Sequence, residues 1–256
     1  MSRYFIQLSY FGKHYHGWQV QENESCTIQQ CLQDKLGMLL QENIEITGCG
    51  RTDTGVHAED YYAHFDSAKE DLSSDGKWLY RFNKILPEDI AIKKILEVKP
   101  TAHARFDAIS RTYEYRIHQI KNAFINDFSL YHYGNLNIEE MNRAANLLLE
   151  VEDFTSFSKV NTQVKNNNCK VTEAVWLKTT NDKLIFKISA NRFLRNMVRA
   201  IVGTLLEVGS GKLSFEEFKK IIESKNRSNA GFSVAAHGLY LTQVEYGDVI
   251  LVVGNK

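Results

Sequence analysis

Strand-like and helix-like segments follow one another in a similar order twice along this chain of 256 residues. Each half begins with a strand-like run, continues with a helix that opens after a capping residue (Thr27 and Asn137), and then returns to strands. The strand-like runs of this repeated order are 3–11 and 56–66 in the first half, and 111–120, 169–178 and 183–190 in the second. The pattern predicts an α+β chain made of two α+β units whose sheets join.

Further local signals complete the expected elements. Ser214 and Glu217 form a capping box, which marks the start of a short helix. An amphipathic helix is expected over 193–209, with Gly209 as the residue just past its end. The remaining expected elements are a helix over 75–86 that ends before Pro87, and strands over 44–47, 90–98, 238–246 and 249–253.

No linker separates the two halves. The chain has two prolines, and no Gly/Ser-rich stretch or run of charges divides it. We therefore expect an N-terminal half over 1–105 and a C-terminal half over 106–256 that share a tight interface.

Composition narrows the class of protein. The apolar fraction is 43% and the charged fraction 24%, values typical of a soluble globular protein. No apolar run reaches the roughly 18 residues of a membrane span. The first residues lack a secretory signal and the four cysteines are scattered, which favours reduced thiols in a cytoplasmic protein and argues against disulfides or a structural zinc site.

The charge balance gives no direct support to nucleic-acid binding. The chain has 31 Lys plus Arg and 31 Asp plus Glu residues, so its formal net charge is zero. Binding to phosphates requires positive charge, but a basic stripe can coexist with an acidic face elsewhere. Cations in loops or at strand ends are candidates for such a stripe: Arg105, Arg111, Lys159, Lys165 and Lys170.

The most unusual stretch is GCGRTDTGVH, over 48–57. Its three glycines permit positive φ angles and a close approach of the backbone to a ligand. Arg51 and Asp53 lie two residues apart on this turn, and loop side chains often carry a protein's chemistry. A carboxylate in such a place can act as a base, a nucleophile or a metal ligand, or it can bond the amides of its own turn.

Asp53, Thr54 and Gly55 also match the Asp-Thr-Gly triplet of aspartic proteases. That chemistry needs two carboxylates that share a proton, and the chain has no second Asp-Thr-Gly or Asp-Ser-Gly triplet. Only a homodimer would supply the second carboxylate, and Arg51 nearby would hold Asp53 ionised.

Aromatic and basic side chains form a second group of candidates. Tyr113 and Tyr115 fall on one face of their expected strand, where they can pack in the core or stack on a nucleobase. Arg195 and Arg199 are four residues apart, so they share one face of the expected helix. That face can meet solvent, contact phosphate or pair with a carboxylate. The eight histidines are dispersed, without the spacing of a metal site.

The turn sequence GRTDTGVHA, over 50–58, resembles the signature of the tRNA pseudouridine synthase A family. The resemblance covers nearly the whole chain, with further blocks in the family's order. These blocks are YFGKHYHGWQVQ (10–21), NKILPEDIAI (83–92), HARFDAISRTYEYRI (103–117), DFTSF (153–157), NRFLRNMVRAIVGTLLEVG (191–209) and GLYL (238–241). The chain departs from the family at Phe11, where Asp is common, and at Lys170, where Arg is usual.

The resemblance implies roles for five residues. Asp53 matches the family's catalytic Asp, and Arg51 matches the Arg two residues before it. Tyr113 matches the active-site Tyr, and Arg199 matches the Arg that pairs with the catalytic Asp. Leu239 matches an apolar wall residue of the site.

The resemblance also implies a fold, a partner and a substrate. The implied fold has two ferredoxin-like or RRM-like α+β halves, with mainly antiparallel sheets joined across a positively charged central cleft. The implied assembly is a homodimer without metal or organic cofactor. The implied substrate is tRNA, with the target uridines at positions 38, 39 and 40 of the anticodon stem-loop.

Isomerisation of uridine to pseudouridine breaks the C1′–N1 bond, turns the uracil and rejoins it through C5. A single ionised carboxylate can serve by attacking C1′ or by taking a proton from C2′, and the sequence leaves both routes open. In this reading Arg199 keeps Asp53 ionised, Tyr113 stacks on the uracil and assists proton removal from C5, and Arg51 occupies the space left by the flipped base.

Three functions remain to be compared. A tRNA-modifying isomerase predicts that Asp53 is required for turnover. A non-catalytic RNA-binding module would tolerate the loss of Asp53. A dimeric aspartic protease would bring two copies of Asp53 within hydrogen-bond distance.

Overall fold

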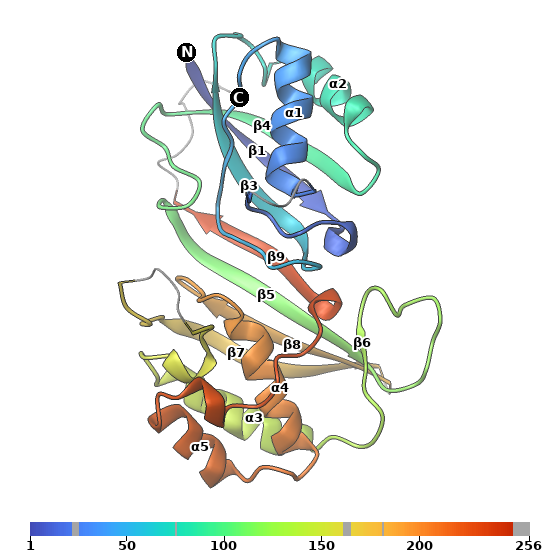
Figure 1. Cartoon of the computed structure of the whole chain (residues 1–256), viewed down its shortest axis with the longest axis vertical. Coiled ribbons are helices and arrows are strands. Elements are labelled where there is room, and N and C mark those ends of the chain that lie inside the picture. The colour runs from blue at the N-terminus through green and yellow to red at the C-terminus, as the bar shows by residue number, and fades with distance from the viewer. Residues whose placement is uncertain (22–25, 75, 161–164, 181, 248–256) are drawn as a thin grey trace. The chain divides into compact units, whose positions relative to one another are not determined.

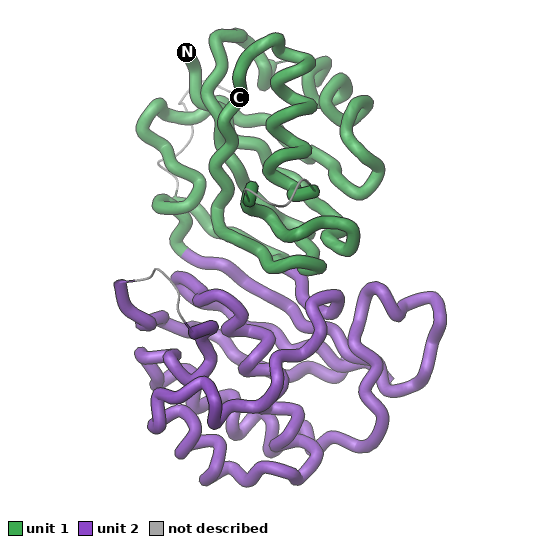
Figure 2. The backbone as a smooth tube through the Cα atoms, in the orientation of Figure 1, with its two compact units in different colours: residues 1–109, 241–256 green, residues 110–240 purple. Residues whose placement is uncertain are grey.

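The computed structural model describes residues 1–21, 26–74, 76–160, 165–180 and 182–247. The chain forms two compact units (Figure 2): unit 1 comprises residues 1–109 together with the chain from Leu241 onward, and unit 2 comprises residues 110–240. Each unit combines helices with mainly antiparallel strands (Figure 1). The α+β class expected from the sequence is therefore confirmed.

The sheet of unit 1 has the strand order β4-β1-β3-β9. β1 (Ser2–Tyr10) is antiparallel to both β3 (His57–Ser67) and β4 (Ile90–Val98), and β9 (Leu239–Tyr246) lies on the other side of β3. Buried side chains of β1 such as Tyr4, Ile6 and Leu8 contribute to the core of the unit. The strands expected over 3–11, 56–66 and 90–98 are confirmed within one or two residues.

Two α-helices lie in the described part of unit 1. α1 (Ile28–Leu40) buries Ile28, Leu32, Leu36 and Leu40, which recur every fourth residue along one face. Thr27 caps this helix by accepting a hydrogen bond from the backbone N–H of Gln30 at 3.2 Å. α2 (Lys77–Ile85) contacts α1 and β4 and buries Phe82 (Figure 1).

The strand expected over 44–47 is wrong in extent. Strand pairing begins only at β2 (Thr47–Gly48), which lies antiparallel to β3. The backbone of Ile46 is instead bonded by α1, because its C=O accepts from Gln29 and its N–H donates to Gln33. The strand expected over 249–253 lies outside the described residues.

The sheet of unit 2 has the strand order β5-β8-β7. β5 (Ala108–His118) is antiparallel to β8 (Lys183–Ala190), which is antiparallel to β7 (Val171–Thr180). The short β6 (Leu130–Tyr131) runs parallel to the end of β5. The expected strand pair is confirmed.

Three α-helices belong to unit 2 within the described residues, and one of them, α3 (Ile138–Asn146), packs on the sheet. α3 packs on β7 and α4 (Met197–Gly209), and α5 (Phe215–Glu223) contacts both helices. The capping box at Ser214 is confirmed, because the Ser214 hydroxyl accepts from the Glu217 N–H while the Glu217 carboxylate accepts from the Ser214 N–H.

The helix expected over 193–209 begins four residues later, at Met197. Asn196 precedes it with a φ of 67°, a left-handed conformation that Asn tolerates better than most residues. Arg195 is therefore outside the helix, and the prediction that it shares a helical face with Arg199 is wrong. At the other end, Gly209 is the last helical residue, and Gly211 is the glycine with the positive φ, 73°.

Candidate active-site residues

Asp53 lies on the turn that joins β2 to β3 in unit 1. The turn is closed by a hydrogen bond from the Val56 N–H to the Asp53 carbonyl at 3.1 Å, and Gly55 has a φ of 79°. Asp53 is half-buried, whereas its neighbours Arg51 and Thr54 are exposed. The carboxylate therefore comes from a fixed turn at the edge of the solvent, where a substrate can reach it.

The backbone around Gly17 packs against this turn and is hydrogen-bonded to it. The Trp18 N–H donates to the Thr52 carbonyl at 3.2 Å, and the hydroxyls of Tyr10 and Thr52 are 2.8 Å apart. Gly17 has a φ of 83°, and a Cβ at this position would lie 2.5 Å from the Thr52 carbonyl oxygen. The glycine is thus needed both for its backbone angle and for its close approach to the residue before Asp53.

Three aromatic rings, those of Tyr10, Trp18 and Tyr61, pack together next to the turn. The rings of Trp18 and Tyr61 stack with centroids 4.1 Å apart, and Tyr10 meets Tyr61 edge-on at 5.5 Å. The Tyr61 hydroxyl donates to the Gly50 carbonyl. A Cβ at Gly48 would overlap this hydroxyl, so the start of the turn requires a residue without a side chain.

His57 follows the turn and is buried, with 1% of its surface exposed. Its ring stacks on Phe11 with centroids 4.5 Å apart and an interplanar angle of 3°. Its Nδ1 accepts from the Gly12 N–H at 2.9 Å, so the ring proton of neutral His57 belongs on Nε2. These contacts make His57 a support for the turn. The sequence pattern did not reveal this role.

Arg51 extends from the same turn toward solvent. Its Nε donates to the side-chain oxygen of Gln19 at 3.3 Å. The guanidinium is therefore held beside the Asp53 turn while remaining exposed. An exposed guanidinium suits contact with phosphate or with the edge of a base.

Unit 2 contains the other three residues singled out from the sequence. Tyr113 lies on β5 opposite Ile188 of β8, is half-buried, and meets the ring of Phe193 edge-on at 5.1 Å. Leu239 is the first residue of β9 and is buried, with 5% of its surface exposed.

Arg199 lies in the first turn of α4. Its Nε donates to the Val234 carbonyl at 2.7 Å, and the Val234 N–H donates back to the Arg199 carbonyl at 3.2 Å. Tyr115 adjoins the same segment, because its hydroxyl donates to the Ala235 carbonyl at 2.8 Å. Burial raises the pKa of Tyr115, and the charge of Arg199 opposes this rise. Arg199 is thus bonded to Val234, which lies five residues before Leu239 in the chain.

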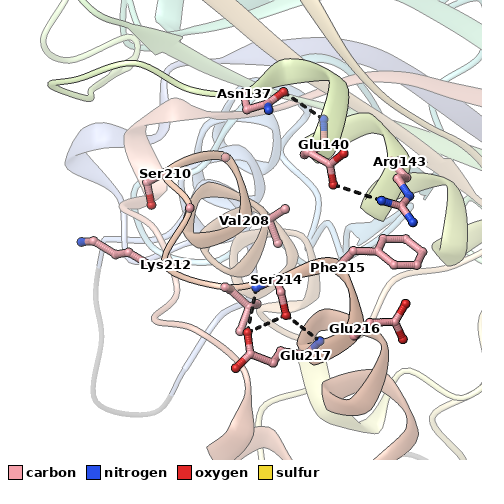
Figure 3. Close-up of a pocket in the computed structure, with 13 residues that line it drawn as sticks. Asn137, Glu140, Arg143, Val208, Ser210, Lys212, Ser214, Phe215, Glu216 and Glu217 are labelled. Carbon is pink, nitrogen blue, oxygen red and sulfur yellow. Dashed lines mark hydrogen bonds and ion pairs between the residues drawn. The ribbon is translucent and has the colours of Figure 1, made fainter.

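The pocket in Figure 3 lies elsewhere in unit 2, at the ends of α3, α4 and α5, and has a volume of about 680 Å³. Three of its charged groups have partners beside them: Arg143 reaches Glu140 at 3.5 Å and covers the ring of Phe215, while Glu217 caps α5 through Ser214. None of the five candidate site residues, Arg51, Asp53, Tyr113, Arg199 and Leu239, lines it. It is a hollow between capped helix ends.

The described residues also bear on metals and membranes. Within them, no group of three or more His, Cys, Asp or Glu side chains is placed to hold a metal ion. No helix in the same ranges is long and apolar enough to cross a membrane.

Comparison with known proteins adds a separate line of evidence. The model of a family described as tRNA pseudouridine synthase matches residues 144–247. The chain is 50% identical over 246 residues to a tRNA pseudouridine synthase A of Bacteroides fragilis, covering 96% of this chain and 97% of the relative. It is 48% identical over 247 residues to one of Porphyromonas gingivalis, covering 96% and 98%. It is 37% identical over 245 residues to one of Bacillus pumilus, covering 93% and 97%.

Proposed function

The chain belongs to the tRNA pseudouridine synthase A family, and we propose that Asp53 is the group with which it isomerises uridine to pseudouridine in tRNA. The observation that carries this proposal is the half-buried Asp53 carboxylate on a turn fixed by Thr52, Val56 and Gly17. A carboxylate held in this way is oriented before the substrate arrives, which lowers the entropic part of the barrier.

The reaction is an isomerisation without net oxidation or reduction. The C1′–N1 bond breaks, the uracil turns, and a C1′–C5 bond forms; the proton at C5 is lost and N1 regains a proton. Asp53 either attacks C1′ or removes a proton from C2′. In the first route its bond to C1′ breaks as the C1′–C5 bond forms, and in the second the proton returns to C2′, so that the free carboxylate is regenerated in both. It must be ionised for either role.

The proposal gives roles to three further residues, Arg199, Tyr113 and Leu239. Arg199 is the positively charged partner of the Asp53 carboxylate. Tyr113 stacks on the uracil and takes part in removing the C5 proton, and Leu239 provides an apolar wall.

The substrate we propose is the anticodon stem-loop of tRNA, at positions 38, 39 and 40. A uridine in a stem must leave the base stack to reach Asp53, at a cost of a few kcal/mol. Arg51, exposed beside Asp53, then fills the vacated space. We further propose that the enzyme works as a homodimer in the cytoplasm, a compartment that suits the four free thiols.

Position mapping on one defined tRNA transcript tests this function. Pseudouridine that has reacted with a carbodiimide stops reverse transcription one nucleotide before the modified base. Wild type is expected to give stops that report positions 38, 39 and 40 where these are uridine, and Asp53→Asn is expected to give none. Stops outside the anticodon arm would contradict the proposed substrate.

A further inference from the structure

The loop over 230–235 in unit 2 presents one aromatic ring to solvent. Phe232 is 90% exposed. A single exposed apolar side chain needs no special explanation. The feature that sets Phe232 apart is that the residues on both sides of it are hydrogen-bonded to neighbouring elements.

The residue before Phe232 is bound to α4. The Gly231 N–H donates to the Thr204 hydroxyl at 3.0 Å, and this hydroxyl donates to the Ala200 carbonyl at 2.8 Å. The Phe232 carbonyl lies directly over Gly203, where an added Cβ would overlap it. The close packing of the loop on α4 therefore depends on a glycine in the helix.

The residues after Phe232 are bound as well. The Ser233 hydroxyl accepts from Arg227 Nη2 at 2.9 Å and from the side-chain amide of Asn196. Val234 exchanges two hydrogen bonds with Arg199, one through its carbonyl and one through its N–H. The same short segment thus orients the Arg199 guanidinium and presents the Phe232 ring.

Two exposed cations, Arg195 and Lys159, lie on segments that adjoin this loop. Arg195 precedes Asn196, whose side chain bonds Ser233, and the Arg195 carbonyl accepts from the Lys159 N–H at 3.0 Å. Both Arg195 and Lys159 are exposed. An exposed aromatic ring on a bonded loop, with cations on adjoining segments, is a combination that binds an unpaired base and its phosphates.

We propose that Phe232 stacks on a base of the tRNA anticodon arm that loses its stacking neighbour when the target uridine is flipped out. The inference rests on the proposed function and adds a positioning residue to it. Flipping leaves the neighbouring bases unstacked. Because the residues beside Phe232 are already bonded, its ring covers one of these bases with less loss of backbone freedom than a ring on an unbonded loop. Phe232 acts on binding of the flipped state and does not touch the reacting atoms.

Four variants test the proposal: Phe232→Ala, Phe232→Leu, Phe232→Trp and the control Phe124→Ala. Phe124 is also highly exposed, at 91%, but lies in a different loop, between β5 and β6. Two quantities are measured on a tRNA transcript labelled with tritium at uridine C5: the Kd, and the rate of tritium release in a single turnover with saturating enzyme. Thermal unfolding checks that each variant folds.

Phe232→Ala and Phe232→Leu should weaken tRNA binding by on the order of 10- to 100-fold. Phe232→Trp should restore binding, because a larger ring stacks at least as well, and Phe124→Ala should match wild type. All four should unfold at the wild-type temperature, since both rings are exposed.

Three results would overturn the proposal. The first is a Phe232→Ala variant that binds and reacts like Phe124→Ala while wild type releases tritium. The second is full affinity in Phe232→Leu, which would indicate apolar contact without stacking. The third is a fall in mass from two chains to one in Phe232→Ala by sedimentation, which would assign the ring to a second copy. A wild type that releases no tritium overturns the proposed function, and the Kd values alone then decide on Phe232.

Discussion

The residues around Asp53 hold the backbone of its turn, whereas the Asp53 carboxylate is the group proposed to react. Thr52 is tied to Tyr10, Val56 closes the turn, and His57 is buried against Phe11. Their contacts hold the backbone, so a change at any of them alters where the carboxylate lies. The candidate nucleophile could be recognised from the sequence because Gly-Arg-Thr-Asp is local. The role of His57 could not, because it depends on a stretch 45 residues earlier in the chain.

Tyr113→Phe removes the hydroxyl of this residue and keeps its aromatic ring, so it tests the two groups separately. The variant keeps the edge contact with Phe193, so tRNA binding should be unchanged. Turnover should fall by about 10²- to 10⁴-fold, the usual contribution of a positioned acid or base. Single-turnover rates and Kd values check this, with Tyr133→Phe, which removes a hydroxyl from a tyrosine that is 85% exposed, as the control. A wild-type rate in Tyr113→Phe would leave stacking as the only role of the ring.

Elements defined by local signals were predicted well, and elements fixed by distant contacts were not. The capping box at Ser214 lies within four residues, and both of its bonds are present. The start of α4 at Met197 depends on Asn196, whose side chain bonds Ser233, 37 residues later. No periodic pattern in the sequence carries that information. The same holds for Ile46, which bonds α1 instead of a neighbouring strand.

The β2–β3 turn offers a matched pair of glycines for testing how tightly it is packed. A Cβ at Gly48 would overlap the Tyr61 hydroxyl, whereas a Cβ at Gly50 would meet nothing within 4 Å. Gly48→Ala should therefore lower the free energy of unfolding by about 1–3 kcal/mol, the usual cost of overpacking. Gly50→Ala should leave it nearly unchanged. Urea unfolding of both variants checks this, and equal stabilities would show that the turn yields to the added methyl group.

The whole molecule has a formal net charge of zero, although it belongs to a family that acts on tRNA. Net charge is a sum over the surface and does not describe its local distribution. The exposed cations Arg51, Arg195 and Lys159 lie beside groups proposed to bind RNA. This is why composition alone gave no support to a function that the motifs indicated.

Stability should depend on pH through His64. Burial, aided by the charges of Arg3 and His103 and opposed by those of Asp66 and Asp107, lowers the pKa of His64 to about 4. The unfolded chain binds this proton below about pH 6.5, and the folded chain resists it because His64 Nδ1 accepts from the Ala104 N–H. The contribution of His64 to the free energy of unfolding is therefore complete above about pH 6.5 and is lost as the pH falls toward 4.

Unfolding free energies of wild type and His64→Asn between pH 7 and pH 4 check this dependence. Asn can still accept a hydrogen bond but does not titrate, so its stability should fall less steeply than that of wild type over this range. Parallel curves for the two proteins would mean that other groups account for the loss.

Tritium release from tRNA labelled at uridine C5 tests the role of Asp53 most directly. Wild type should release tritium, while Asp53→Asn and Asp53→Ala should release none above background and should still bind the same tRNA. That result would assign the isomerisation to the Asp53 carboxylate. Release by either variant at the wild-type rate would contradict the account, and Asp53 would then be a residue that only shapes its turn.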